Sequence, residues 1–423
     1  MTLNLREKAA AGWLIPLIYA LGAMALGFTV PRLAYTLLPG FTSTVSVDAA
    51  IGIYSSVASG MLALTAIVFS LSFVMVQFSA TAYSPRLVLW VARDPVMSHA
   101  LGIFTATFLY ALSSLAWVDR ANSGRVPLVG VVLTVTLLII SIIMFVALIH
   151  RVSMLQINRM LIFTGNRGRD IIENLYPPID TPSSVAWGSA APSSQVLYHH
   201  GPPRIIQSVN IAILVETARQ AGCMIEMTAA VGDAVLDTTP VLRVIDAVAP
   251  LPEEVLRQAI RLGGERTFEQ DPKYAIRLLV DIAIKALSAA VNDPTTAVQA
   301  LDQIEDLLIR LGRRRLEIGA FHDAQGKQRL SVPFPGWEDF LRLSFDEIRY
   351  YGGTSIQVMR RMNALISELI SIMPEERRPA LRYWQKRFRS TIERSFRDAE
   401  DARDALEEDR QGLGSSRNMA NRT

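Results

Sequence analysis

The chain has little of what most enzymes and secreted proteins depend on. It contains one cysteine, Cys223, so no disulfide can form within the chain. The lack of disulfides is typical of protein domains in a reducing compartment. It has no G-x-S-x-G, phosphate-loop, paired-cysteine or H-E-x-x-H pattern. We therefore expect no enzyme, metal site or cofactor. His199 and His200 are a weak metal signal, and a solvated loop pair is the simpler interpretation.

Charge is missing from four long apolar runs in the first third of the chain. They cover residues 9–30, 49–78, 100–118 and 127–148, and none contains Asp, Glu, Lys or Arg. About 20 apolar residues span a bilayer core of ~30 Å. We expect four transmembrane helices within residues 1–151. A cleavable signal peptide is the competing interpretation of the first run, but its apolar stretch is too long for a typical one.

Basic residues set the expected orientation of these spans. Arg6 and Lys8 precede the first run, Arg86 and Arg93 lie between the second and third, and four arginines at 151, 159, 167 and 169 follow the fourth. The opposite loops carry fewer net charges, so the positive-inside rule places both termini in the cytoplasm. We expect a multi-pass protein of the bacterial inner membrane, in contact with lipids.

The rest of the chain is water-soluble in composition and indicates a mixed α/β, mostly helical domain. We expect a connecting helix and linker at 152–195 and a small α/β unit at 196–250. A helical domain with a hairpin near 318–332 should follow at 251–373, and a charged C-terminal helix and tail at 374–423. Asp–Pro pairs mark two helix starts, predicting helices over 272–291 and 294–312; a third helix is expected over 253–263.

The second apolar run gathers its smallest and most polar side chains into one stripe. The stripe comprises Gly52, Ser56, Ser59, Ala63, Ala66, Ser70 and Gln77. Small residues let helices approach closely in lipid. Two interpretations fit: packing against another helix of the same subunit, or copies of this helix around a symmetry axis, with the stripe lining a narrow path for ions or solutes. The two interpretations are compatible if the stripe packs against a helix of another subunit.

Three further groups of residues stand out. Ser84, Pro85 and Arg86 follow the second run and predict a structural elbow, with a gate as the alternative. Asp281 and Lys285 have the i,i+4 spacing of an ion pair within an apolar helix. Asn292, Asp293 and Pro294 read as a helix cap followed by a first-turn proline, without a catalytic role.

Two charged segments have several interpretations. Arg310, Arg313, Arg314 and Arg315 favour a solvated helix end, then contact with anionic lipid, with nucleic acid least favoured because aromatic residues are not interleaved. We expect no nucleic-acid partner. The helix after Pro379 has an apolar stripe that either packs on its own domain or docks a protein partner.

Several segments together resemble a known family. These are "FSLSFVMVQFSATAYSPRLVLWVARDPV", "RIIQSVN", "GDAVLDTTPVLRV" and "QDPKYAIRLLVDIAIKALSAAVNDPTTAVQALDQI". Their Ser-Pro-Arg and Asn-Asp-Pro motifs are similar to those of the bacterial predicted membrane proteins that are classed as a domain of unknown function. The resemblance implies several spans in the inner membrane followed by a cytoplasmic domain. It implies no established activity.

These features favour a homo-oligomeric channel or conduit, assembled or gated by its cytoplasmic domain. The stripe, the uncharged spans and the missing catalytic motifs all point this way, because pumps and voltage sensors normally carry charges within their spans. The alternative is a non-conducting scaffold or stress sensor that recruits partners through the cytoplasmic domain. An enzyme acting on lipid ranks third.

Overall fold

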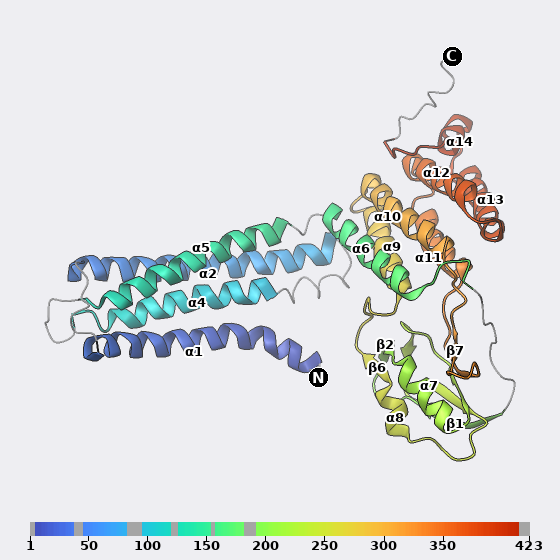
Figure 1. Ribbon diagram of the computed structural model, residues 1–423. Coiled ribbons are helices and arrows are strands. Elements are labelled where there is room, and N and C mark those ends of the chain that lie inside the picture. Colours follow the sequence, from blue (N-terminus) through green and yellow to red (C-terminus); the bar gives the residue numbers. More distant parts are fainter. Residues whose placement is uncertain are drawn as a thin grey trace. The chain divides into compact units, whose positions relative to one another are not determined.

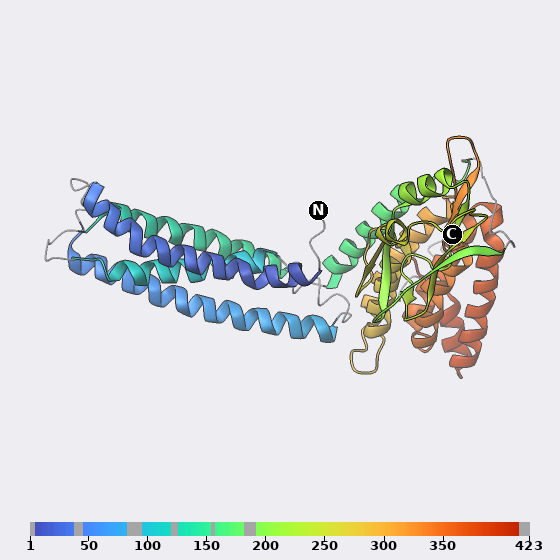
Figure 2. The same cartoon turned by 90° about the horizontal axis from the view of Figure 1, so that it is seen from below.

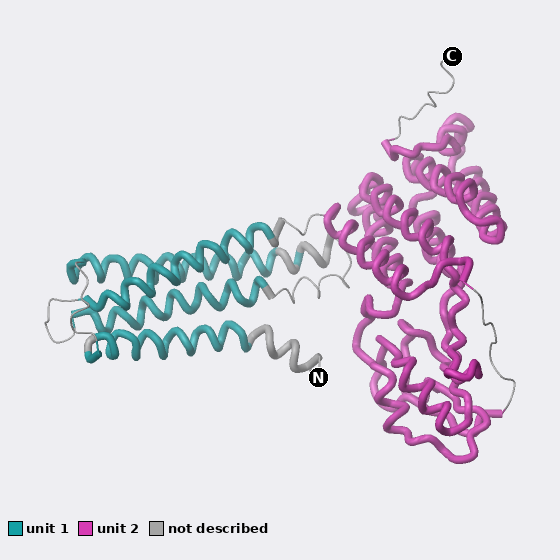
Figure 3. Tube along the Cα trace, viewed as in Figure 1, with its two compact units in different colours: residues 1–156 teal, residues 157–423 magenta. Residues whose placement is uncertain are grey.

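The computed structural model describes residues 5–37, 45–82, 95–119, 126–153, 157–181 and 192–413. These fall into two units, residues 1–156 and residues 157–423 (Figure 3). The first unit holds the apolar helices, and the second holds all the described strands together with the remaining described helices. This division confirms the expected fold class, an α-helical multi-span part followed by a mixed α/β, mostly helical domain.

Four helices of the first unit are long and apolar enough to cross a membrane. They are α1 (Leu5–Leu37), α2 (Val47–Ala82), α4 (Pro95–Leu115) and α5 (Leu128–Ser153), with candidate spans Leu14–Ala34, Val47–Val74, Val96–Leu115 and Leu128–His150. The helices lie side by side along much of their length (Figures 1 and 2). The observed spans overlap the four runs expected from the sequence.

Helix α4 is the centre of this bundle. It packs against α1, α2 and α5, and 44% of its span is buried, against 17% for each of the other three. Small residues allow the close contacts: a Cβ on Gly27 of α1 would lie 2.5 Å from the Cβ of Ser113, and one on Gly102 would lie 2.8 Å from the ring of Tyr19. The core therefore runs along α4, and the outer helices turn most of their surface outward.

The helical part of the second unit is built on a layer of α9, α10 and α11. Helix α6 (Ile157–Leu175) packs on α9 (Pro272–Ala286) and α10 (Pro294–Gly312), and α11 (Trp337–Tyr351) packs on α9. Helix α12 (Ile356–Ile372) packs on α10 and also contacts α13 (Arg378–Ser395) and α14 (Ala399–Leu406), with the short helix η1 (Glu375–Arg377) between α12 and α13. The buried faces are Leu-, Ile- and Ala-rich, with the three-to-four spacing of amphipathic helices.

Two small sheets form the rest of this unit and share one apolar core. The five-stranded sheet has the order β1-β5-β3-β8-β7, and the three-stranded sheet has the order β4-β2-β6. The strands are β1 (Ser193–Tyr198), β2 (Arg204–Val209), β3 (Met224–Met227), β4 (Ala234–Val235), β5 (Pro240–Ile245), β6 (Ile260–Gly263), β7 (Ala320–His322) and β8 (Gln328–Ser331). Helices α7 (Ile211–Gln220) and α8 (Glu253–Gln258) add apolar residues to this core, and the side chain of Asn210 caps α7.

The structure corrects the sequence-based boundaries in three places. The hairpin β7–β8, which we assigned to the helical domain, joins the five-stranded sheet, because β8 pairs in parallel with β3. The helix expected over 253–263 stops at Gln258, and its second half is strand β6, paired with β2. Helix α9 ends at Ala286, five residues before the expected end. Long-range strand pairing decided the first two cases.

Candidate functional site

The packing face of α2 is formed by an aromatic residue and a row of small and medium apolar residues. Ala50, Tyr54, Ala58, Met61 and Val68 are each at most 7% exposed and pack against side chains of α4 or α5. Their spacing of three, four and seven residues defines one side of the helix. The contacts of α2 with the rest of its own subunit are therefore concentrated on this side.

The seven stripe residues lie on the other side of α2. All of them are exposed in the described bundle, and a Cβ added at Gly52 would meet nothing within 4 Å. At about 100° per residue, Ala63 lies about half a turn around the helix from Tyr54. The interpretation in which the stripe packs inside its own subunit is therefore wrong for the helices that the structure describes.

The serine hydroxyls of the stripe differ from those near the packing face. Ser72 and Thr65, beside that face, donate to the carbonyl oxygens of Val68 and Met61 at 2.6 and 2.7 Å. Within the described residues, the hydroxyls of Ser56, Ser59 and Ser70 make no hydrogen bond. Placing a hydroxyl in hydrocarbon costs free energy unless the hydroxyl has a hydrogen-bond partner. The outward face of α2 thus offers free hydroxyl groups between small side chains.

Large apolar side chains border this face. Leu62, Phe69 and Phe73 lie on one flank and Ile67 on the other, each between 54% and 67% exposed. Lipid contact favours such large groups, whereas a row of small residues favours a second helix, because backbones can then approach closely. The geometry suits another helix against the stripe and lipid at the flanks.

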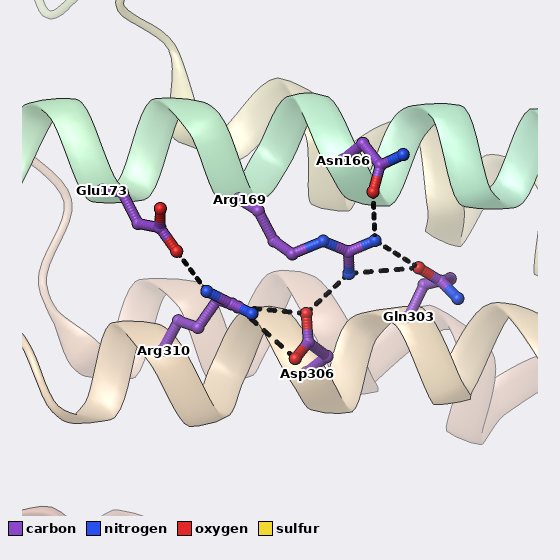
Figure 4. Close-up of polar contacts among 6 residues, drawn as sticks. All are labelled: Asn166, Arg169, Glu173, Gln303, Asp306 and Arg310. Atoms are coloured by element: carbon purple, nitrogen blue, oxygen red, sulfur yellow. Dashed lines mark hydrogen bonds and ion pairs between the residues drawn. The ribbon is translucent and has the colours of Figure 1, made fainter.

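A second polar site fixes α6, the first helix after the spans, to α10. Arg169 of α6 donates from Nη1 to Oδ2 of Asp306 at 2.6 Å and from Nη2 to Oδ1 of Asn166 at 2.6 Å, and its guanidinium lies 3.4 Å from Oε1 of Gln303 (Figure 4). Arg310 of α10 bonds to Asp306 from Nε at 3.2 Å and to Glu173 of α6. We call these six residues the α6–α10 lock.

Two glycines of α6 bring the helices of the lock together. A Cβ at Gly168 would lie 2.8 Å from Cδ1 of Leu307 and 3.0 Å from the Cβ of Ala275, so α6 approaches both α10 and α9. At Gly165 the nearest atom is the side-chain oxygen of Gln303. The backbone of α6 therefore lies close to α10, within reach of the polar side chains of the lock.

The predicted Asp281–Lys285 pair is replaced by a longer-range network. Arg277, one turn before Asp281, contacts it at 2.5 Å and also forms a two-armed ion pair with Glu347 of α11, at 2.7 and 2.8 Å. The pKa of Arg277 is raised, and its hydrogen bonds to Glu347 are the largest cause. Among the described residues, Lys285 forms no ion pair with Asp281. The charges join α9 to α11 instead of bracing α9 alone.

The Asn-Asp-Pro motif is a structural turn, as the sequence indicated. Asn292 has a left-handed backbone with φ of 48°, which asparagine tolerates better than most residues. Asp293 caps α10 by accepting from the backbone nitrogen of Thr296 at 3.1 Å and from its hydroxyl at 2.6 Å, and Pro294 is the first helical residue. The backbone nitrogen of Asp293 donates to the carbonyl oxygen of Ala286 at 2.8 Å, so the last residue of α9 is tied directly to the cap of α10.

The remaining predicted residues lie in varied surroundings. Ser84, Pro85 and Arg86 fall outside the described residues. In the arginine cluster, Arg310 belongs to the lock, and the arginines at 314 and 315 donate to the carbonyl oxygens of residues 176 and 179. The apolar stripe of the C-terminal helix is buried inside its own domain; Leu381, Trp384, Phe388 and Ile392 are at most 4% exposed. That stripe is therefore covered in the folded chain.

Other polar groups fit a structural role. His199 is buried and its Nε2 lies 2.9 Å from the carbonyl oxygen of Pro202, while His200 is exposed beside Asp237. Across the described ranges, no three His, Cys, Asp or Glu residues gather closely enough to hold a metal ion. Asp271 is 1% exposed beside Arg266, and burial raises the pKa of its carboxyl group.

Sequence reasoning did not find the α6–α10 lock. Arg169 and Asp306 are 137 residues apart, and each has the appearance of an ordinary surface charge on an amphipathic helix. The only local signal is the pair of glycines at 165 and 168, since glycine inside a helix lowers its stability unless close packing requires it.

Comparison with known proteins agrees with these features. A family model described as "Predicted membrane protein (DUF2254)" matches residues 10–368. An uncharacterized protein of Mycobacterium bovis and an uncharacterized protein of Mycobacterium tuberculosis are each 27% identical over 375 residues, covering 84% of this chain and 71% of the relative. No solved structure matches the chain. With four apolar helices and a family match over most of its length, this chain is a membrane protein that belongs to the DUF2254 family.

Proposed function

We propose that the protein is a homo-oligomeric channel or conduit for ions or small solutes in the bacterial inner membrane. Copies of α2 meet through their small-residue faces around a common axis, and both termini lie in the cytoplasm. The protein acts without catalysis or a cofactor, and its partners are lipids and further copies of the chain. The second unit assembles the subunits or gates the path through α6.

The observation that carries this proposal is the position of the stripe. Its small residues and unpartnered hydroxyls face away from the subunit, about half a turn from Tyr54 on the packing face. Serine hydroxyls around an axis can replace part of the hydration shell of a passing solute. The absence of charged residues from the four runs favours a passive path over a pump.

The test is conductance of the full-length protein in planar bilayers or liposomes. Ala63→Leu or Ala66→Leu adds bulk at the centre of the proposed axis and should reduce the conductance at least about tenfold, since side-chain bulk narrows a pore directly. Ala147→Leu is the matched control, because Ala147 is exposed on α5, a helix that carries none of the stripe residues. This variant should conduct like the original chain.

Two results would contradict the proposal. Unchanged conductance in both α2 variants would show that the stripe does not line the conducting path. Oligomers without any conductance would favour the alternative, a non-conducting scaffold held together by the same face. Recruitment through the apolar side of α13 is not favoured, because that side is buried.

A further inference from the structure

A cavity of about 490 Å³ lies where three chain segments meet in the second unit. Ile179 and Asp180 come from the turn after α6, Arg315 and Glu317 follow α10, and residues 374–377 form the corner between α12 and α13. The first two segments are tied by backbone bonds from Arg315 to Pro177 at 3.0 Å and from Ile179 to Arg313 at 3.2 Å. Cavities of this volume hold small-molecule ligands in other proteins.

One wall of the cavity carries a firmly held arginine. Arg377 is 8% exposed, its guanidinium lies 5.9 Å from the ring centre of Trp337, and its Nη2 donates to the carbonyl oxygen of Arg314 at 3.2 Å. Its nearest carboxylates, those of Glu317 and Glu376, lie at 3.6 and 3.9 Å, beyond ordinary hydrogen-bond length, and Nε has no acceptor. This buried cation is only loosely neutralised.

A second arginine of the cavity has fewer partners still. Arg315 donates from Nη2 to the carbonyl oxygen of Ile179 at 3.2 Å, while its Nη1 is buried and has no acceptor. It forms no ion pair with any carboxylate in the described part of the chain. A buried guanidinium without an anionic partner costs free energy. Arg377 is buried and Arg315 is half-buried, and both line the cavity. Together they are suited to an oxyanion, which guanidinium groups bind with paired hydrogen bonds.

The rim of the same cavity is acidic. The side chains of Glu317 and Glu376 are 48% and 64% exposed, and Asp180 and Glu375 also lie in solvent. These carboxylates would repel a ligand that carries only negative charge, and they would attract an ammonium group. We propose that the cavity binds a small zwitterion, with its phosphate or carboxylate on Arg315 and Arg377 and its amine at the acidic rim.

This inference concerns binding alone and does not depend on conduction. Two sources share the required chemistry: a free metabolite such as an amino acid or a phosphorylated amine, and the head group of phosphatidylethanolamine. A ligand in the cavity would join the turn after α6 to the corner between α12 and α13. Binding would therefore stabilise the end of α6 against the helical domain.

The experiment measures thermal unfolding of the full-length protein in neutral detergent while phosphoethanolamine is titrated, because a ligand of the folded state raises the unfolding temperature. Inorganic phosphate and ethanolamine serve as probes of each half. Phosphoethanolamine should bind most tightly, and Arg315→Gln should weaken it at least about tenfold through loss of charge-assisted bonds. Arg313→Gln is the matched control, since Arg313 is exposed beside the cavity.

Further variants separate the two halves of the ligand. Glu376→Gln should weaken phosphoethanolamine about threefold and should strengthen inorganic phosphate, because this carboxylate attracts the amine and repels a ligand that carries only negative charge. Should Arg315→Gln fail to fold, Arg315→Lys keeps the charge, loses the two-armed donor, and should weaken binding as well. In nanodiscs, phosphatidylethanolamine added to phosphatidylcholine should block the free probe if the lipid is the source, and leave its binding unchanged if a metabolite is.

The inference would be overturned by either of two outcomes. One is the absence of a saturable shift with all three probes up to about 10 mM, ten times a weak Kd of about 1 mM. The other is an equal loss of binding in Arg315→Gln and Arg313→Gln, which would mean that general positive charge, and not the cavity, attracts the probe.

Discussion

Nη1 of Arg169 lies 2.6 Å from Oδ2 of Asp306, and this contact joins the first helix after the membrane spans to the centre of the helical domain. Asp306 also accepts from Arg310, so one carboxylate bridges two arginines from two helices (Figure 4). The side chains of Arg169 and Asp306 are 22% and 39% exposed, so water screens the attraction between them only partly. The lock is thus the most direct polar connection between α6 and the rest of its unit.

We first predict that Asp306 and Arg169 are energetically coupled. A double-mutant cycle of Asp306→Asn and Arg169→Gln is measured by chemical unfolding of the full-length protein. The coupling free energy should be about 1–2 kcal/mol, because the pair is partly buried and Asp306 also bonds to Arg310. The pair Arg257–Glu253 is the control, because both side chains are at least 43% exposed and should contribute under about 0.5 kcal/mol. Equal coupling in both pairs would contradict a special role for the lock.

The two glycines of α6 should respond differently to the same substitution. Gly168→Ala should destabilise by about 1–2 kcal/mol, because the new Cβ meets Leu307, which is fully buried and cannot move aside. Gly165→Ala should be close to neutral, since the new Cβ meets the movable ends of the Gln303 and Arg169 side chains and alanine favours the helix by about 1 kcal/mol. Urea unfolding of the two variants checks the order, and the reverse order would refute the close approach of α6 to α9 and α10.

Cysteine cross-linking tests contact between copies of α2. In a Cys223→Ala background, Ser59→Cys should form disulfide-linked dimers on mild oxidation in membranes, because copies around an axis bring this position together. Phe69→Cys is the control, as Phe69 is 57% exposed but lies about a quarter turn away. Cross-linking that is equal at both positions would indicate random collision.

Asp271→Asn should raise stability at neutral pH. Burial raises the pKa of Asp271 in the folded state. The contribution of Asp271 to folding stability is therefore most favourable below about pH 3.9, the ordinary pKa of Asp. That contribution is lost as the pH rises through the raised pKa. The difference in unfolding temperature between this variant and the original chain should be largest near pH 7 and shrink as the pH is lowered. A difference that grows on acidification would reverse the assigned sign.

Asp323→Asn should behave in the opposite way. Arg329 bonds to this carboxylate at 2.7 Å and, as the largest cause, lowers its pKa; two backbone nitrogens of the hairpin add to the effect. The stabilisation is present above about pH 3.9 and is lost as the pH falls through the lowered pKa. The substitution should therefore lower the unfolding temperature at pH 7, and have less effect in strong acid. No loss at pH 7 would contradict the assignment.

Local patterns were sufficient for the spans and for most helix starts. A run of about 20 uncharged residues has few alternatives to a membrane helix, since its backbone must satisfy its own hydrogen bonds in lipid. Caps are equally local: Asn210, Asp293 and Ser355 each bond to a backbone nitrogen three residues on. These features follow from neighbours within one turn, and the cap at Asp293 appears in the structure as predicted.

Contacts between distant segments were beyond local patterns. Strand β6 and the hairpin β7–β8 take their places because β2 and β3 are available to pair with them. Arg277 pairs with Glu347, 70 residues away, although Lys285 is nearer to Asp281 in sequence. The direction of the small-residue stripe on α2 also needed the position of α4, because periodicity gives the faces of a helix but not what each face meets.

The sequence by itself determined a four-span membrane part, a mixed and mostly helical soluble part, and a small-residue face on α2, because hydrophobicity, capping and helical period act over a few residues. Tertiary structure alone decided that this face turns away from its own subunit, that Arg169 meets Asp306, and that two poorly neutralised arginines share a cavity. Those outcomes depend on which distant surfaces pack together, and packing is settled by the whole fold.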